Sequence, residues 1–406
     1  MNKLIKKLPI PESFPNKEET LTLKLILCKD EEFLTMWEIW KSSVVFDDID
    51  FATLRILPMV YTRLINLGIS DELAGKIKGA YRMAWAKNQK TLHSAADAIK
   101  LLMDAGIPVM VLKGIPLLVN YYKDTGARFM GDADILVKPG DVKKSIELLR
   151  KNNWHYVDKA FESAHNSNTA GIMNVTKETN FQDSNGNEID VHWGLFHSTN
   201  RLGLLDQLFG NNHDHILAFE DLEPRSLPIS FAGTSCMMPS HEDSLIHVIA
   251  HGSVRNDHRA IRWVTDATAI IRNSSLDWDY LLQQTQKFSF VIEMQVALRY
   301  LKETYSVEIP DDFLRTLATI PVKKSNIKRY YKNANGTPYT LLGAFPLLWR
   351  TYWSSHKHGS FLKRTVGFLD YSAKSFGLPN KRSLVSFAVK KYIERLTYYL
   401  KKIFQK

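Results

Sequence analysis

The sequence predicts an α/β fold of the α+β kind, in which a mixed-sheet core is flanked by N-terminal and C-terminal helical regions. Three observations predict it. Apolar residues recur at three- and four-residue intervals through the first hundred positions, as they do on one face of a helix. Short apolar runs of strand length then follow at residues 107–112 and 133–137. Helical spacing returns after Ser240.

The N-terminal region is expected to be helical. Leu54, Leu57 and Leu64 share one helix face, and residues 83–105 are rich in good helix formers. Gly106 is expected to end that helix, because glycine adopts the left-handed conformation of a C-cap at little cost.

The central region is expected to alternate short strands and helices, in the order strand 107–112, helix 115–122, strand 133–137, helix 142–151 and strand 154–157. Asp141 is the candidate N-cap of the helix that follows it. A hairpin is expected next, because Ser184-Asn-Gly-Asn187 separates two strand-like runs and Asn-Gly suits a tight turn. Further on, Ser240 and Asp243 have the spacing of a helix-starting capping box.

Composition excludes several classes of protein. The chain has 406 residues, of which 45% are apolar and 24% are charged, so a disordered or collagen-like protein is excluded. Cys28 and Cys236 are too few and too far apart for a disulfide framework or a cysteine zinc site. No apolar run approaches the about 18 residues of a membrane span, and no secretory signal is apparent. We therefore expect a cytoplasmic protein, with peripheral membrane association as a further option.

The net charge of +10 conceals a split along the chain. Residues 321–406 carry a net +16, whereas the remainder carries −6. We expect four segments, which are an N-terminal helical region (1–106), a core with the candidate site (107–235), a C-terminal helical domain (236–320) and a basic, aromatic-rich helical tail (321–406). Residues 383–406 have the spacing of an amphipathic helix with a cationic face. Such a tail suits an anionic membrane surface or a nucleic acid, or it packs on the body with a solvated face.

Three carboxylates are the candidate chemical groups. Asp132 and Asp134 stand two apart at the start of a strand, so their side chains project from one face. Asp190 lies on the second strand of the predicted hairpin, and a neighbouring strand would bring it beside the pair. Clustered carboxylates repel one another unless a cation lies among them. Magnesium suits them because it prefers oxygen ligands and binds substrate phosphates.

The motifs around these acids resemble a known family. They are Leu112-Lys-Gly114, then Arg128-Phe-Met-Gly-Asp-Ala-Asp-Ile135, then Ile189-Asp-Val-His-Trp193. In this order they are similar to the DNA polymerase beta-like nucleotidyltransferase superfamily, and within it to a branch of poorly characterised bacterial nucleotidyltransferases. Segments at 57–61, 241–251 and 262–266 are also similar to that branch, so the resemblance covers roughly residues 20–300.

The resemblance implies a nucleotidyltransferase-type mixed-sheet core, two Mg²⁺ ions (with Mn²⁺ as the alternative) and transfer of a nucleoside monophosphate with release of pyrophosphate. Asp132, Asp134 and Asp190 would be the metal ligands and catalytic residues, and Asp190 would also help to deprotonate the acceptor hydroxyl. The superfamily has Gly-Ser or Gly-Gly where this chain has Lys113-Gly114. The glycine still allows phosphate to approach backbone N–H groups, and the lysine adds a charge for phosphate.

Further candidates for nucleotide binding are Arg128, His192 and His251. Arg128 either clamps a phosphate or forms an ion pair with Asp132 or Asp134. His192 shares a strand face with Asp190, and the alternative for it is a packing role. His247 and His251 are four apart on a helix, where interhelical packing is the simpler reading, although His251 could reach the cleft.

Arg262 and Asp266 are also four apart, and we expect an ion pair between them.

These observations predict an Mg²⁺-dependent nucleotidyltransferase that uses an NTP, with ATP favoured only by its abundance. The acceptor hydroxyl or phosphate stays open among an antibiotic, a sugar precursor, a peptide, a protein side chain and an RNA end. Two alternatives belong to other classes. The same metal site could direct attack to the γ-phosphate, as in a kinase, or the protein could be a non-catalytic nucleotide-binding scaffold docked by its tail.

Overall fold

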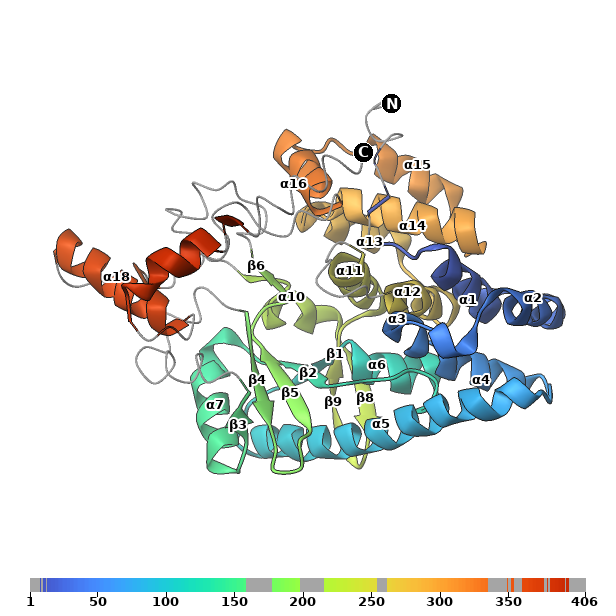
Figure 1. Ribbon diagram of the computed structural model, residues 1–406, viewed down its shortest axis with the longest axis horizontal. Helices are drawn as coiled ribbons and strands as arrows, with labels where there is room; N and C mark the ends of the chain where they lie inside the picture. Colours follow the sequence, from blue (N-terminus) through green and yellow to red (C-terminus); the bar gives the residue numbers. More distant parts are fainter. Residues whose placement is uncertain are drawn as a thin grey trace. The chain divides into compact units, whose positions relative to one another are not determined.

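The structure is a computed structural model that describes residues 8, 10–11, 13–157, 177–197, 215–253, 261–334, 349, 352–353, 360–375, 378, 380–390 and 392–393. The chain divides into two compact units. The first comprises Met1–His155, Asn180–Leu195 and Ile216–Pro338, and the second comprises Tyr156–Thr179, Phe196–His215 and Tyr339–Lys406. The α+β fold class is confirmed, with a mixed sheet and helical flanks (Figure 1).

The N-terminal region is helical, as predicted. Its elements are α1 (Lys17–Leu27), α2 (Asp30–Ser43), the 3₁₀ turn η2 (Phe46–Asp48), α3 (Phe51–Leu54), α4 (Leu57–Asn66) and α5 (Glu72–Asp104). The last of these begins earlier than the predicted residue 83, because Asp71 caps it by accepting the Leu73 N–H at 2.9 Å. Gly106 follows its end with φ +78°, as expected of a glycine after a helix.

The main sheet has seven strands in the order β3-β4-β5-β2-β1-β9-β8. These are β1 (Met110–Leu112), β2 (Ala133–Leu136), β3 (His155–Tyr156), β4 (Glu178–Gln182), β5 (Glu188–His192), β8 (Leu227–Phe231) and β9 (Thr234–Met238). β2 pairs antiparallel with β1 and parallel with β5. A separate two-stranded sheet consists of β6 (Phe196–His197) and β7 (His215–Ile216). The predicted strands are therefore confirmed, although β1 covers only the second half of residues 107–112.

The connections differ from the prediction in two places. They are α6 (Gly114–Pro116), the π-helix η3 (Leu117–Tyr122), the 3₁₀ turn η4 (Pro139–Asp141), α7 (Val142–Lys151), α10 (Phe219–Leu222) and the 3₁₀ turn η6 (Glu223–Arg225). The segment expected as one α-helix over 115–122 is thus one α-helical turn that widens into a π-helix. Asp141 precedes α7 as predicted, but its side chain makes no capping hydrogen bond, because it already belongs to the 3₁₀ turn.

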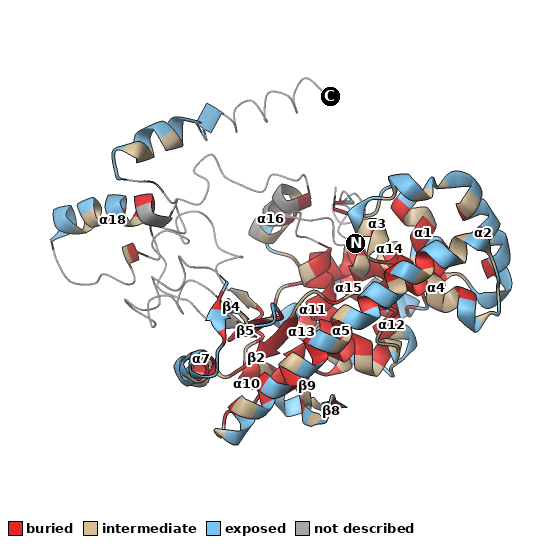
Figure 2. Ribbon diagram, turned by 60° about the horizontal axis from the view of Figure 1, so that its bottom comes forward, coloured by how far each residue is buried: buried red, intermediate tan, exposed pale blue. Residues whose placement is uncertain are grey.

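The C-terminal part of the first unit is a set of helices. They are α11 (His241–Gly252), α12 (Arg262–Arg272), α13 (Trp278–Lys287), α14 (Val291–Tyr305), α15 (Asp311–Thr319) and α16 (Lys324–Ala334). Ser240 caps α11 by accepting the Asp243 N–H, as its spacing predicted. In Figure 1, α5 runs beneath the strands while α11–α14 lie above them. Buried residues concentrate in the strands and in α11 and α12 (Figure 2).

The second unit contains α18 (Phe361–Ser375), and residues 383–390 are helical as well. The predicted amphipathic helix over 383–406 is therefore helical as far as the structure describes it, and residues 391 and 394–406 lie outside the described residues. Across the described residues, no helix is both long and apolar enough to cross a bilayer.

Candidate active site

The pairing of β2 with β5 brings two of the predicted acids together. The two strands run parallel, and their register places Asp134 opposite Asp190. Their neighbours Ala133, Ile135 and Ile189 are buried and hold the strands in the core. Both carboxylates are buried, with Asp134 4% and Asp190 9% exposed. The prediction that Asp190 lies beside the Asp-x-Asp pair is thereby confirmed for Asp134.

A histidine joins these two acids. One ligand atom each from Asp134, Asp190 and His192 lies within 4.8 Å of the others. His192 Nε2 contacts Asp134 Oδ1 at 2.8 Å, and Asn180 Nδ2 donates to Asp190 Oδ1 at 2.7 Å. Donor atoms around one divalent ion with bonds of about 2.0–2.2 Å lie about 3–4 Å apart, so this group has the spacing to hold a metal.

Asp132 stands apart from that group but is coupled to it. It is half-buried one position before β2 and is not among the three clustered residues. Burial and the negative charge of Asp134 raise the pKa of Asp132, while Lys113 and Arg262 act in the opposite direction. The repulsion expected between the two carboxylates is therefore present.

The Lys113-Gly114 turn lies against the same acids. Leu112 at the end of β1 pairs with Asp134, which brings the next residue, Lys113, alongside. The Lys113 ammonium lies 2.6 Å from Asp134 Oδ1, and the residue has the strained backbone angles φ 45° and ψ −102°. Burial alone would raise the pKa of Asp134, but Lys113 and His192 outweigh burial and hold that pKa below its usual range.

Gly114 allows the backbone to approach its surroundings closely. A Cβ at this position would lie 2.5 Å from the Met130 Sδ, which is closer than any real contact. The glycine is thus required by packing of the turn against the loop that leads to Asp132.

Arg128 forms an ion pair, but with a partner other than the predicted ones. Its Nε and Nη2 donate to Asp266 Oδ1 and Oδ2 at 2.7 and 2.9 Å, and both residues are buried. The Tyr122 hydroxyl donates to the same carboxylate at 3.0 Å. The predicted pair between Arg262 and Asp266 is therefore wrong, because Asp266 faces Arg128, and Arg262 donates to the Phe129 carbonyl instead.

The histidines of α11 lie near the acids. His247 is buried, and burial followed by the charges of Lys113 and His251 lowers its pKa well below the usual range, so it is neutral. Asp134 and His192 also act on it electrostatically. The ring of the half-buried His251 lies 6.0 Å from that of His247. His247, interpreted from sequence as a packing residue, thus borders the site.

Two arginines near Asp132 were not predicted as site residues. Arg55 follows α3, and Arg262 begins α12. The charge of Asp132 acts on both guanidinium groups. Nothing in the local pattern marks Arg55, because an isolated arginine in a helical segment is usually solvated, and the pattern around Arg262 predicted only an ion pair with Asp266. Only the fold brings them to the acids.

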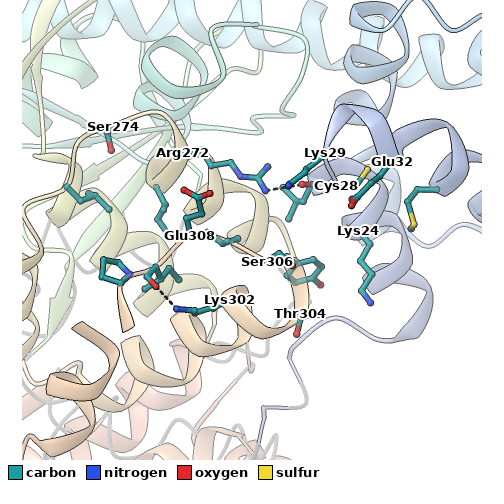
Figure 3. Close-up of a pocket in the computed structure, with 18 of the residues that line it drawn as sticks. Lys24, Cys28, Lys29, Glu32, Arg272, Ser274, Lys302, Thr304, Ser306 and Glu308 are labelled. Atoms are coloured by element: carbon teal, nitrogen blue, oxygen red, sulfur yellow. Dashed lines mark hydrogen bonds between the residues drawn. The ribbon is translucent and has the colours of Figure 1, made fainter. Parts of the chain in front are cut away.

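A cleft of about 1330 Å³ lies elsewhere in the first unit (Figure 3). It is lined by residues of α1, α2, α12 and α14, including Lys24, Arg272 and Lys302. Arg272 donates to the Leu27 carbonyl at 3.0 Å, and Lys302 donates to the Ile309 carbonyl at 2.7 Å. Its lining, taken from the described residues, includes none of the three clustered metal-ligand candidates. The candidate metal ligands of β2 and β5 therefore lie outside this cleft.

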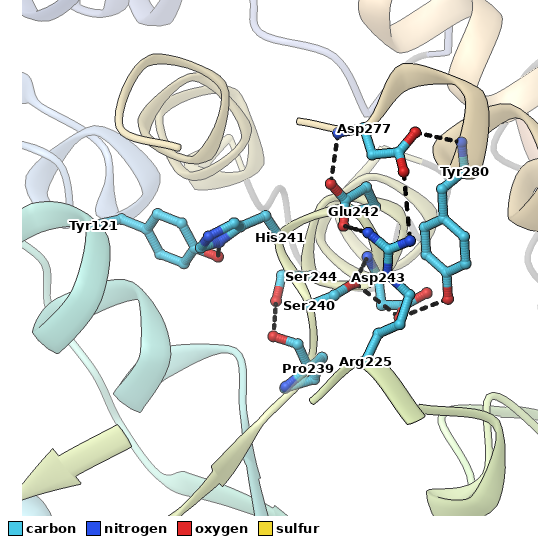
Figure 4. A network of polar contacts seen from close by, with 10 residues as sticks. All are labelled: Tyr121, Arg225, Pro239, Ser240, His241, Glu242, Asp243, Ser244, Asp277 and Tyr280. Atoms are coloured by element: carbon cyan, nitrogen blue, oxygen red, sulfur yellow. Dashed lines mark hydrogen bonds and ion pairs between the residues drawn. The ribbon is translucent and has the colours of Figure 1, made fainter. Parts of the chain in front are cut away.

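A polar network that is buried at Asp243 and exposed at Arg225 and Asp277 surrounds the start of α11 (Figure 4). Arg225 lies 3.9 Å above the Tyr280 ring and 3.4 Å from the Asp277 carboxylate. Asp243 accepts hydrogen bonds from the Ser240 hydroxyl at 2.9 Å and the Tyr280 hydroxyl at 3.4 Å. Burial raises the pKa of Asp243 to about 6. This network positions the helix that carries His247.

Comparison with known proteins identifies the family. A search of curated proteins finds no match. The profile of a family described as "uncharacterised nucleotidyltransferase" matches residues 51–306, which is more than half of the 406 residues. The match runs from α3 to α14, so it includes the sheet, the acids and the flanking helices. With these features together, the chain belongs to this family of uncharacterised nucleotidyltransferases.

Proposed function

We propose that this protein is an Mg²⁺-dependent nucleotidyltransferase of the DNA polymerase beta-like superfamily. It transfers a nucleoside monophosphate from an NTP to a hydroxyl or phosphate of an acceptor and releases pyrophosphate. One observation above all supports the proposal. The parallel register of β2 and β5 places Asp134 beside Asp190, next to the Lys113-Gly114 turn, in a chain of a nucleotidyltransferase family.

Asp132, Asp134 and Asp190 are proposed to hold two Mg²⁺ ions, or Mn²⁺ in their place. When bound, these ions stabilise the charge on the attacking and leaving oxygens. Imidazole suits Mg²⁺ less well than carboxylate does. We therefore assign His192 to orienting Asp134 through its 2.8 Å contact and not to direct ligation of magnesium.

Lys113 and Gly114 are proposed to bind the NTP phosphates. The ammonium group now neutralises Asp134, and once cations do so it is available to a phosphate oxygen. His251, whose ring lies 6.0 Å from that of His247, is proposed to contact the nucleotide, whereas Arg128 serves indirectly, because its guanidinium is held by Asp266. Asp190 accepts the proton of the acceptor hydroxyl. The acceptor oxygen then bonds to the α-phosphorus, and the bond from that phosphorus to the bridging oxygen breaks, leaving its electron pair on pyrophosphate.

We also propose that the chain consists of the four segments that its sequence predicts, with boundaries after residues 106, 235 and 320. The tail at 321–406 is proposed to dock on an anionic membrane surface, so that a cytoplasmic enzyme works at the periphery of the membrane. An apolar stripe favours a membrane over a nucleic acid. Leu362, Val366 and Leu369 are exposed at helical spacing on α18, and Lys363 lies among them.

The test uses ATP labelled at the α- or the γ-phosphate, incubated with the protein, Mg²⁺ and an extract fractionated by size. The proposal expects label from the α-position in a larger product and pyrophosphate from the γ-position. Transfer should fail without divalent metal and in Asp134→Asn and Asp190→Asn variants. Transfer of the γ-label alone would make the protein a kinase. Saturable nucleotide binding without any transfer would make it a scaffold.

A further inference from the structure

Three arginines gather around Asp132 with too few carboxylates to balance them. They are Arg55, Arg128 and Arg262, and the acids that act on them are Asp132 and Asp266. Arg128 takes both oxygens of Asp266 in a bidentate pair. Arg55 and Arg262 are left to share Asp132, which the proposed function assigns to metal.

The loop before Asp132 brings the two remaining guanidinium groups together. Arg262 Nη1 donates to the Phe129 carbonyl, and the Arg55 guanidinium lies 5.3 Å above the Phe129 ring. Phe129 stands three positions before Asp132. Both guanidinium groups therefore contact Phe129, in the loop that leads to the predicted metal ligand Asp132.

Asn88 of α5 holds this loop in place. Its side-chain amide donates to the Thr125 and Arg128 carbonyls at 2.6 and 2.7 Å, and its carbonyl accepts the Met130 N–H at 2.8 Å. Asn88 is fully buried. Three hydrogen bonds to Asn88 thus hold the loop whose residue Phe129 contacts both arginines.

The Arg55 guanidinium has unused hydrogen-bonding capacity. Its Nε is buried and has no hydrogen-bond partner within the described chain, and the residue forms no ion pair there. The guanidinium lies 5.4 Å from the centroid of the Phe51 ring and 5.3 Å from that of Phe129, so two of its neighbours are aromatic rings that cannot balance its charge as a carboxylate would. Burial, together with the positive charge of Arg128, lowers the pKa of Arg55, and the same two effects plus Arg55 itself lower the pKa of Arg262 to about 9. The lowered pKa values indicate that the positive charges of Arg55 and Arg262 are not balanced by a nearby counter-ion.

We propose that Arg55 and Arg262 form a binding site for a phosphate group, adjacent to Asp132, that holds either the polyphosphate of the nucleotide or a phosphate of the acceptor. Guanidinium groups suit this ligand because their planar donor edge matches two phosphate oxygens. The inference rests on the proposed function for the identity of the substrates, but not for the presence of an anion site. Arg55 lies within the matched family region, in the helical segment before the core, so that segment completes the site.

The test is a calorimetric titration of the full chain with tripolyphosphate, ATP and inorganic phosphate, without divalent metal. Arg55→Met is expected to weaken binding of the ligand that occupies the site by roughly 10- to 100-fold, as loss of a charged hydrogen bond implies. Arg55→Lys should lose less, because it keeps the charge. Arg82→Met removes an exposed arginine of α5 and should bind as the wild type does. Thermal melts of each variant establish that it is folded.

The three ligands separate the two sources of phosphate. If Arg55→Met binds tripolyphosphate and ATP more weakly than the wild type does, the site belongs to the nucleotide. If Arg55→Met binds only inorganic phosphate more weakly, the site belongs to a phosphorylated acceptor. Equal affinity of Arg55→Met, Arg82→Met and wild type for all three would overturn the inference. Because no turnover is measured, such a failure is distinct from a failure of label transfer in the wild type.

Discussion

At the scale of single residues, Asp134 Oδ1 is shared by two cationic or polar neighbours. Lys113 Nζ lies 2.6 Å and His192 Nε2 lies 2.8 Å from this one oxygen. The carboxylate is therefore held in one orientation from two sides. Such contacts around a metal ligand orient it and tune its affinity.

The first prediction concerns His192. Replacing it with glutamine removes the imidazole that orients Asp134, so the affinity for Mn²⁺ should fall by about 10- to 100-fold. A titration followed by electron paramagnetic resonance of free Mn²⁺ measures this affinity. The control is His155→Gln, an exposed histidine of β3. Equal affinity of the two variants would exclude the positioning role.

The second prediction concerns Asp243, whose pKa is raised to about 6 by burial. In the unfolded chain this carboxyl has a pKa of about 4, so the folded state binds its proton more tightly. The stability that this group contributes is full below about pH 4 and is lost as the pH rises towards 6, by roughly 3 kcal/mol.

Asp243→Asn mimics the protonated acid at every pH. Its free energy of unfolding should therefore exceed that of the wild type by an amount that grows between about pH 4 and pH 6 and then levels off. Urea denaturation at a series of pH values measures the difference. A difference that stays constant across this range would show that the carboxyl does not titrate as described.

At the scale of elements, two glycines in different surroundings make a matched pair. Gly114 starts α6 with Met130 against it, whereas Gly75 in α5 has nothing within 4 Å of its Cβ position. Gly114→Ala should destabilise the fold by about 1–3 kcal/mol, because the buried Met130 must shift. Gly75→Ala should stabilise it by about 0.5–1 kcal/mol, since alanine favours a helix.

Denaturant unfolding of the two variants checks both signs. If Gly114→Ala were as stable as the wild type, the turn would not be packed against the loop that precedes Asp132. If Gly75→Ala were destabilised, this part of α5 would not be an unobstructed helix.

Local patterns predict the elements well, and long-range pairings poorly. The strand at 133–137 and the Asn-Gly hairpin follow from apolar spacing and turn chemistry, which act within a few residues. The parallel pairing of β2 with β5 depends on the whole topology, so the sequence suggested only that Asp190 could lie near Asp134.

The candidate site shows the same division. Asp134 and Asp190 lie within recognisable sequence motifs. Arg55 lies in none, because only helix packing brings it near Asp132. The partner of Arg128 was missed for a similar reason. Asp266 lies on a distant helix, and a four-residue spacing favoured Arg262 as its partner. The π-helix η3 likewise follows from no local rule of propensity.

At the scale of the whole molecule, the end of the family match and the start of the basic segment lie close together in the sequence. The family match ends at residue 306, and the strongly basic segment begins at 321. α18 in that segment exposes Phe361 and Leu362 to 71% and 77%. Large apolar side chains beside cations are characteristic of helices that lie at a membrane surface.

The last prediction follows from this surface. The full chain should sediment with vesicles that contain phosphatidylglycerol and should be released as salt rises, because the attraction is partly electrostatic. Phe361→Ser with Leu362→Ser should weaken vesicle binding by about 10-fold or more, since two apolar side chains no longer enter the lipid. Leu34→Ser, at an exposed leucine of α2, is the control. Binding to duplex DNA that the double substitution leaves unchanged, without binding to vesicles, would instead identify a nucleic acid as the partner of the tail.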